Sequence, residues 1–291
     1  MKQLLILSGK GGTGKTTISS AFIHLAQAQA YADCDVDAPN LHLINRKTGQ
    51  PETSDFDGLD KAQINQEKCD QCGDCMEACR FGAISFENNR YEVDYLACEG
   101  CSVCIEICPQ KAIDPVRSIT GELMLYRGQD SIFSTAQLKT GSGNSGKLVA
   151  EVKKRMKEAA PEATPLAIID GSPGIGCPVI ASLSGIDTVL IVAEPSLSGI
   201  SDLERIVKTA RNFRVDCAVC INKHDLNPER TQDIKAFCER EEIPCVGKIP
   251  FDLEVNRAVN QGLCISQVPC PAQKAIETVY QNVTQLMELT S

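Results

Sequence analysis

The stretch "SGKGGTGKTT", residues 8–17, follows a short apolar run near the start of the chain and decides the fold. Its glycines satisfy the G-x-G-x-x-G pattern of dinucleotide-binding loops, but that pattern alone is a weak signal. The stretch also satisfies G-x-x-x-x-G-K-T, in which Lys15 and Thr16 open a helix. Backbone N–H groups of such a loop cradle phosphate oxygens, the lysine neutralises their charge, and the threonine hydroxyl can bind Mg²⁺. A dinucleotide site does not need this lysine and threonine, so the stretch favours a nucleoside triphosphate with Mg²⁺.

The chain outside residues 57–116 alternates short apolar runs with helical patterns. The apolar runs, which we expect to be strands, are 4–8, 30–35, 166–171, 188–194, 215–222 and 245–250. They are almost continuously apolar, as strands of a parallel sheet are when helices cover both faces. The helical patterns are 16–29, 147–159, 199–213, 229–241 and 272–289, and a hairpin is expected over 122–138. We therefore predict an α/β fold with a doubly wound, mostly parallel sheet, formed by residues 1–56 and 117–291.

Residues 57–116 form a cysteine-rich segment with an internal repeat, in which Cys69 corresponds to Cys98 and Ile64 to Val93. Each half contains one C-x2-C-x2-C-x3-C run. Zinc sites often use two C-x-x-C pairs, whereas this spacing is that of ferredoxins with two 4Fe–4S clusters, in which the fourth cysteine of each run binds the other cluster. We predict an inserted, small α+β ferredoxin-like domain with one cluster on Cys69, Cys72, Cys75 and Cys108 and another on Cys98, Cys101, Cys104 and Cys79.

The composition indicates a cytoplasmic protein. Of 291 residues, 43% are hydrophobic, which is ample for a core, yet we see neither a run long enough to span a membrane nor a leader segment. The sixteen cysteines favour metal ligands and core packing in a reducing compartment over disulfides. The whole chain has a net charge of −9, and the stretch from Asp57 to Asp114 contains twelve acidic and five basic residues. This balance disfavours nucleic acid and anionic membranes as partners; it favours a basic docking partner, or is simply a solvated acidic surface.

Lys10 is a second lysine at the beginning of the phosphate loop. With it, "GKGGTGKTT" resembles the deviant Walker A motif of MinD/ParA-type P-loop ATPases. In that family the extra lysine reaches across an ATP-sandwiched dimer to the phosphates of the partner subunit, much as an arginine finger does. The resemblance implies this role for Lys10, with a homodimer formed on ATP binding or a heterodimer with a paralogous ATPase.

The resemblance also covers motifs beyond the loop. "DCDVDAPNLHL" (33–43) resembles the switch I segment, in which Asp35 would orient the attacking water, and "DGSPGIG" (170–176) resembles switch II. The implied catalytic residues are Lys10, Lys15 and Asp35, and the implied Mg²⁺ ligands are Thr16, Asp35 and Asp170. The implied ATP-binding residues are Gly9, Lys10, Gly11, Gly12, Thr13, Gly14, Lys15, Thr16 and Thr17, with Asn222, Pro250 and Asp252 at the adenine.

The remaining cysteines are expected to have structural roles. Cys217 and Cys220 should face opposite sides of a strand, which prevents them from binding one ion together. Cys177, seven residues after Asp170, is expected to pack at a helix start, although it resembles a cysteine that holds a subunit-bridging cluster in nitrogenase iron protein. The other cysteines expected to be structural are Cys34, Cys238, Cys245, Cys264 and Cys270.

The cysteine-rich segment separates the two switches, which suggests a function. ATP binding and hydrolysis at the switches would control electron transfer, or partner docking, through two 4Fe–4S clusters. The cofactors would be ATP, Mg²⁺ and these clusters, and the partner a redox protein. The alternative is an iron–sulfur scaffold, carrier or metallocofactor-maturation ATPase, whose partner would be an apo-metalloprotein. Retention of the clusters over many turnovers would distinguish the first function from the second.

Overall fold

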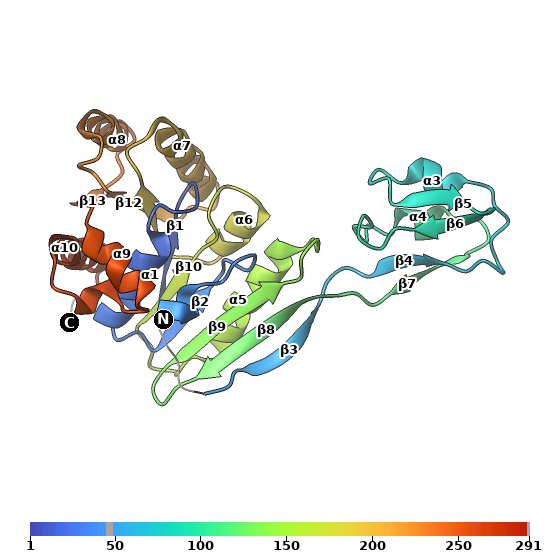
Figure 1. Ribbon diagram of the computed structural model, residues 1–291, viewed down its shortest axis with the longest axis horizontal. Coiled ribbons are helices and arrows are strands. Elements are labelled where there is room, and N and C mark those ends of the chain that lie inside the picture. Colours follow the sequence, from blue (N-terminus) through green and yellow to red (C-terminus); the bar gives the residue numbers. More distant parts are fainter. Residues whose placement is uncertain (45–48, 290–291) are drawn as a thin grey trace.

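The computed structural model describes residues 1–44 and 49–289, and it has two parts that lie apart along its longest axis (Figure 1). The larger part contains a nine-stranded sheet with helices on both faces. The smaller part is joined to one edge of that sheet. Within the described ranges, no helix combines the length and the apolar content that crossing a bilayer requires.

The nine-stranded sheet confirms the prediction of a mostly parallel α/β fold. Seven neighbouring strands pair in parallel, and the last two pair antiparallel at the edge that carries the smaller part. The hairpin expected over 122–138 is the pair β8 and β9. In spatial order the strands are β13 (Cys245–Ile249), β12 (Asp216–Asn222), β11 (Thr188–Ala193), β1 (Lys2–Leu7), β10 (Leu166–Asp170), β2 (Ala30–Asp33), β9 (Ile132–Leu138), β8 (Ile119–Arg127) and β3 (Glu52–Asp57).

Two hydrophobic cores lie on the two faces of this sheet. In β1, Leu5 and Leu7 belong to one core while Leu4 and Ile6 belong to the other. The side chains on both faces of this strand are therefore apolar. Cys217 and Cys220 of β12 also face different cores, as predicted. Residues of α5 (Ser145–Ala159), α6 (Cys177–Leu183), α7 (Leu197–Asn212) and α8 (Pro228–Arg240) belong to the first core. Those of α1 (Lys15–Leu25), α2 (Leu41–Ile44), α9 (Leu253–Asn260), η1 (Ile265–Gln267) and α10 (Pro271–Leu286) belong to the second.

The smaller part displays the internal repeat of the sequence. Its six elements form three pairs, each separated by one repeat length, and both of its two-stranded sheets join one half of the repeat to the other. The halves therefore share one small core of apolar residues and cysteines. The elements are β4 (Lys61–Ile64), α3 (Asp74–Ala78) and β5 (Ile84–Glu87), repeated as β6 (Arg90–Val93), α4 (Val103–Ile107) and β7 (Ile113–Val116).

A two-stranded ribbon connects the two parts. The pair β3 and β8 leads directly into the pair β4 and β7 (Figure 1). At the junction, Gly58 N donates a hydrogen bond to Ser118 O at 2.9 Å, and Arg117 pairs with Asp57 at 2.6 Å. Lys147 of α5 adds a bond from its ammonium group to Asp57 O at 3.0 Å. The base of the ribbon is thus held against the helical layer of the larger part.

Candidate functional site

A large hollow lies at the carboxyl ends of the parallel strands, where open α/β sheets bind their ligands. Its empty volume is about 1640 Å³. Two predicted site residues do not line this hollow. Gly9 lines a separate small hollow, where it faces Asp202. Asp170 lies beneath the large hollow and contacts Lys15 and Thr16 of the phosphate loop. The predicted site residues that the hollow brings together are Lys10, Gly11, Gly12, Thr13, Gly14, Lys15, Thr16, Thr17, Asp35, Asn222, Pro250 and Asp252.

The phosphate loop is supported from the end of β12. Gly14 has a φ of 93°, and a Cβ atom added there would lie only 2.4 Å from Asn222 Nδ2, so this position requires glycine. Asn222 Nδ2 donates a hydrogen bond to Thr13 O at 2.6 Å, and its Oδ1 accepts one from Lys223 N at 3.0 Å. Asn222 therefore holds the loop in this structure, and its contact with adenine stays a prediction.

A buried charge network lies under the loop. Lys15 Nζ is 2.9 Å from Asp170 Oδ1, and the two side chains are 6% and 0% exposed. Thr16 Oγ1 donates to Asp170 Oδ2 at 2.8 Å, and Ser19 Oγ donates to Oδ1 at 2.6 Å. Burial by itself would lower the pKa of Lys15, but Asp170 and more distant carboxylates outweigh burial and leave that pKa raised. Asp170 thus keeps the lysine charged and the threonine hydroxyl oriented, and the role of Ser19 was not predicted from the sequence.

This network predicts a large loss of stability in the Asp170→Asn variant. Without nucleotide, we expect its free energy of unfolding to fall by about 3–5 kcal/mol, because Lys15 would remain charged and buried without its main partner. Urea unfolding followed by circular dichroism measures the change. The exposed Asp37→Asn variant is the control and should stay within about 0.5 kcal/mol of the wild type.

A second variant shows whether the lost pairing is the cause. Combining Lys15→Met with Asp170→Asn removes both charges, so most of the lost stability should return. Wild-type stability in the single variant, or an equal deficit in the double variant, would contradict the role that we assign to this pair.

Two aspartates shape the segment after β2. Asp33 is completely buried, and its carboxylate accepts backbone N–H bonds from Asp35, Asn40 and Leu41, each at 3.0 Å. Burial, together with the nearby Asp170, raises the pKa of Asp33 to about 7. Asp35 is half-buried and lines the hollow, as its predicted catalytic role requires. Asp33 therefore folds the segment that presents Asp35, a role that its position in the strand did not reveal.

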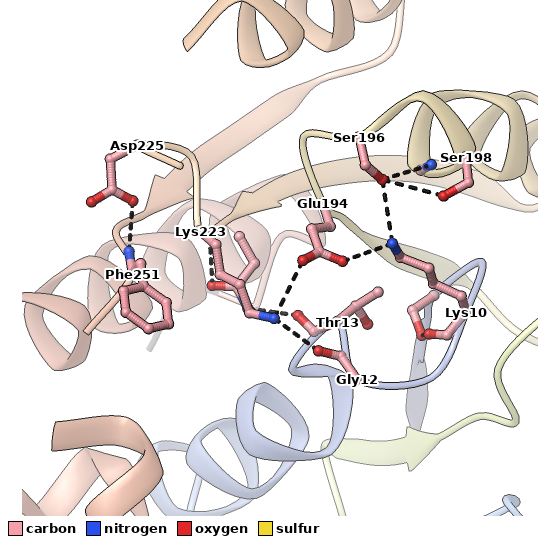
Figure 2. Close-up of polar contacts among 12 residues, drawn as sticks. Lys10, Gly12, Thr13, Glu194, Ser196, Ser198, Lys223, Asp225 and Phe251 are labelled. Atoms are coloured by element: carbon pink, nitrogen blue, oxygen red, sulfur yellow. Dashed lines mark hydrogen bonds and ion pairs between the residues drawn. The ribbon is translucent and has the colours of Figure 1, made fainter. Parts of the chain in front are cut away.

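Lys10 takes part in a cluster that the sequence did not predict (Figure 2). Its Nζ lies 3.1 Å from Glu194 Oε2 and 3.3 Å from Ser196 Oγ. Glu194 also pairs with Lys223, whose ammonium group donates to Gly12 O at 2.9 Å. Burial would raise the pKa of Glu194, but the two lysines outweigh it and hold that pKa below its usual value. Within one chain, Lys10 is thus bound to a carboxylate beside the loop.

The two predicted cysteine sets line two separate cavities in the smaller part. The cavities have empty volumes of about 410 and 320 Å³. Each set takes three cysteines from one half of the repeat and one from the other, so the structure brings together the residues that the spacing predicts. The first cavity is lined by Cys79, Cys98, Cys101 and Cys104, and the second by Cys69, Cys72, Cys75 and Cys108.

The donor sets of these cavities fit 4Fe–4S clusters. Four thiols surround each cavity, and backbone groups supply further contacts, such as the bond from Ala112 N to Cys108 Sγ at 3.3 Å. In the described part of the chain, no three His, Cys, Asp or Glu side chains converge on a single point where one metal ion would bind. Cluster binding itself stays a prediction.

One expectation for the remaining cysteines is wrong. Cys177 begins α6 as expected, but its side chain is exposed rather than packed. Cys245, which was expected to be structural, is exposed at the start of β13, the edge strand of the large sheet. The other cysteines expected to be structural are buried, namely Cys34, Cys238, Cys264 and Cys270.

Some sequence relatives match almost the whole chain, and others match a short stretch of it. An uncharacterized protein of Methanocaldococcus jannaschii is 29% identical, covering 98% of this chain and 97% of its own length. An iron–sulfur cluster carrier protein of Pyrococcus horikoshii is 22% identical over 99% of this chain and 87% of its own. Pyruvate synthase subunit PorD of M. jannaschii is 42% identical over only 55 residues, which are 19% of this chain and 64% of PorD.

A solved structure and a family model each match most of the chain. The septum site-determining protein MinD of P. horikoshii, in complex with Mg-ADP, has a TM-score of 0.60 at 16% identity and covers 100% of this chain and 98% of its own. At this identity the likeness shows the fold alone. The family model described as the CobQ/CobB/MinD/ParA nucleotide binding domain matches residues 4–265, which is most of the chain. The chain therefore belongs to the CobQ/CobB/MinD/ParA family, and its larger part is a MinD/ParA-like P-loop ATPase domain.

Proposed function

We propose that this chain is an ATPase whose nucleotide cycle controls electron transfer, or docking of a redox partner, through 4Fe–4S clusters bound in residues 57–116. The observation that carries the proposal is a line of contacts from the switch II segment to one cysteine cavity. It runs from the start of α6, through the loop before α5, to the backbone between Cys98 and Cys101. The ATPase site and that cavity therefore have a physical connection besides the ribbon.

The first contact of this line joins the smaller part to the loop before α5. A Cβ atom added to Gly143 would lie 2.7 Å from Glu99 Oε2, so the Glu99 carboxylate lies against this loop. A Cβ atom on Gly100 would lie 2.7 Å from Asp60 O, so the same turn also lies on the ribbon. A displacement of the loop would therefore be transmitted to the turn that carries Cys98 and Cys101.

The second contact joins that loop to switch II. A Cβ atom on Gly146, in the first turn of α5, would lie 3.3 Å from Cys177 O at the start of α6. The residues just before α6 include Gly174, which has a φ of 94° and donates its N–H to Ser8 O at 2.9 Å. Segments that bind the γ-phosphate rearrange when it is released. Such a rearrangement at Gly174 would move α6 and, through it, the loop before α5.

At the nucleotide, each of the predicted site residues would have one role. Lys15 would neutralise charge on the phosphates, Thr16 and Asp170 would hold Mg²⁺, and Asp35 would orient the attacking water. The dimer is part of the proposal, because Lys10 would act on the phosphates of the partner subunit. The partner subunit would be a second copy or a paralogous ATPase.

In the smaller part, the cysteines would bind the clusters, and the acidic surface would select the partner. When bound, 4Fe–4S clusters supply one-electron transfer. The excess of acidic residues between Asp57 and Asp114 favours a basic redox protein. A second candidate function, transfer of clusters to apo-proteins, is favoured by the likeness to an iron–sulfur cluster carrier protein. Clusters that leave the chain for an acceptor during turnover would support the second function against the first.

The contact between Glu99 and the loop before α5 gives a direct test. In anaerobically reduced wild type, we expect Mg-ATP to change the EPR spectrum, because the switches would displace the turn beside one cavity. Glu99→Ala removes the side chain that lies against this loop and should abolish most of this change while ATP hydrolysis continues. Glu106→Ala is the matched control, because it removes the same side chain and charge from the same part of the chain, and it should keep the response.

The outcomes separate the possibilities. If the wild type hydrolyses ATP but its EPR spectrum is the same with and without Mg-ATP, the nucleotide does not control the clusters. An equal loss of response in both variants would assign the effect to charge alone, and the line of contacts would then be wrong.

A further inference from the structure

A surface hollow at the edge of the large sheet farthest from the smaller part contains two cysteines. Cys238 comes from α8 and Cys245 from the start of β13, and both residues line this hollow. Cys238 is buried at 2% exposure, whereas Cys245 is exposed. The hollow has an empty volume of about 940 Å³, and Lys235 and Lys248 also line it. One thiol can therefore meet a molecule from solvent while the other lies behind it.

The backbone holds the two thiols together. At the end of α8, Glu242 has a φ of 55°, Ile243 N donates to Cys238 O at 2.9 Å, and Glu242 N donates to Glu239 O at 3.2 Å. This pair of bonds is a Schellman motif, which reverses the chain beside the last turn of a helix. Pro244 O then accepts a hydrogen bond from Val219 N at 2.9 Å, which fixes the start of β13 on its neighbour strand. Cys245 is thus returned to the side of Cys238 by a short connection that these hydrogen bonds hold in place.

The surroundings of Cys245 favour a thiolate. The neighbouring Cys238 thiol and the Gly247 N–H stabilise a negative charge on its sulfur, and Lys235 and Lys248 add positive charge. The Cys238 thiol, as the largest influence, lowers the pKa of Cys245 to about 6, against the opposing effect of burial. The pKa of Cys238 is raised, first by its interaction with Cys245 and then by burial. The other ionisable groups near the pair are Cys220 on β12 and two residues of the α8 end, Glu239 and Glu242.

We propose that Cys238 and Cys245 form a redox-active dithiol that reduces disulfides by thiol–disulfide exchange. The Cys245 thiolate attacks one sulfur of R–S–S–R, which forms a mixed disulfide and releases R–S⁻. The Cys238 thiol gives its proton to the released thiolate, attacks the Cys245 sulfur and releases the second R–S⁻. Two electrons pass to the substrate, and the products are the Cys238–Cys245 disulfide, one R–SH and one R–S⁻. The site is independent of the proposed nucleotide and cluster functions.

The test uses the complete, anaerobically purified protein. It is incubated with bis(2-hydroxyethyl) disulfide as a small substrate or with insulin as a protein substrate, then alkylated and mapped by mass spectrometry without reduction. We expect at least one of them to produce a peptide pair linked through Cys238 and Cys245, and the productive one identifies the substrate source. Cys238→Ala should stop at the mixed disulfide on Cys245, and Cys245→Ala should leave Cys238 unmodified.

A second measurement follows the thiolate without any substrate. At pH 6, alkylation of Cys245 by iodoacetamide should be at least about tenfold slower in Cys238→Ala, because the neighbouring thiol that lowers the pKa of Cys245 is lost. The exposed Cys177 in the same samples is the control, and its rate should not change. Three outcomes would overturn the proposal. Neither substrate yields peptides linked through Cys238 and Cys245, or the wild type keeps a mixed disulfide on Cys245. The third is an alkylation rate of Cys245 that does not change in Cys238→Ala.

Discussion

Replacing Lys10 with alanine is expected to lower kcat for ATP hydrolysis about 10³-fold, the effect of losing an arginine finger, while ATP affinity changes little. In a single chain, the ammonium group of Lys10 is paired with Glu194 and Ser196 and is not needed to hold the phosphate loop. On dimer formation it would leave Glu194 for the phosphates of the partner subunit. Phosphate release measures kcat, and a nucleotide-binding titration measures the affinity.

Two comparisons make this prediction specific. Lys223→Ala removes the other lysine that pairs with Glu194, and it should lower kcat far less. Mixing Lys10→Ala with Lys15→Ala protein should restore activity that neither has alone, because the Lys15→Ala subunit still offers Lys10 to the intact loop of its partner. If the mixture stays inactive although both variants fold and associate, Lys10 does not act across the dimer.

Replacing one cavity cysteine with alanine is expected to halve the iron content, from about eight to about four atoms per chain. The pairing of the cavities makes the double variants more informative than the single ones. Cys79→Ala combined with Cys104→Ala should still leave about four irons, because both cysteines line the same cavity. Cys79→Ala combined with Cys75→Ala should leave almost none, because Cys75 lines the other.

This comparison tests the crossed ligand sets directly. If each run of four cysteines bound its own cluster, the combination of Cys75 and Cys79 would spare half of the iron, and that of Cys79 and Cys104 would remove it all. Cys177→Ala, which changes an exposed cysteine of the larger part, is the control and should keep all the iron. Iron and sulfide analysis of anaerobically purified protein gives these numbers.

Local patterns were sufficient to predict the fold of the larger part. Strands that are buried on both faces need apolar residues at every position, so β1, β10 and β11 appear as continuous runs in the sequence. The short helix α9 was not expected, because eight residues are too few to display a clear helical period. The loop lysine and the two cysteine runs could be found because their chemistry depends on spacing between residues close in the chain.

Contacts between distant residues could not be predicted in this way. Glu194 meets Lys10 across 184 positions of the chain, and Ser19 meets Asp170 across 151. Only the pairing of strands in the sheet brings such residues together, and a single sequence contains no local pattern for it. The contact of Glu99 with the loop at Gly143 likewise depends on how the two parts pack. Cys238 and Cys245 are close in the chain, but the geometry of a helix end brings them together, and their spacing alone does not reveal it.

The base of the ribbon is the one place at which the cysteine-rich insertion is covalently joined to the ATPase sheet. Gly58 N and Ser118 O are hydrogen-bonded at 2.9 Å, so the chain leaves the ATPase and returns to it at nearly one place. A tight turn between these residues would complete an ordinary hairpin of β3 and β8. A redox module can therefore be grafted onto this hairpin, or exchanged for another, without rerouting any strand of the host sheet.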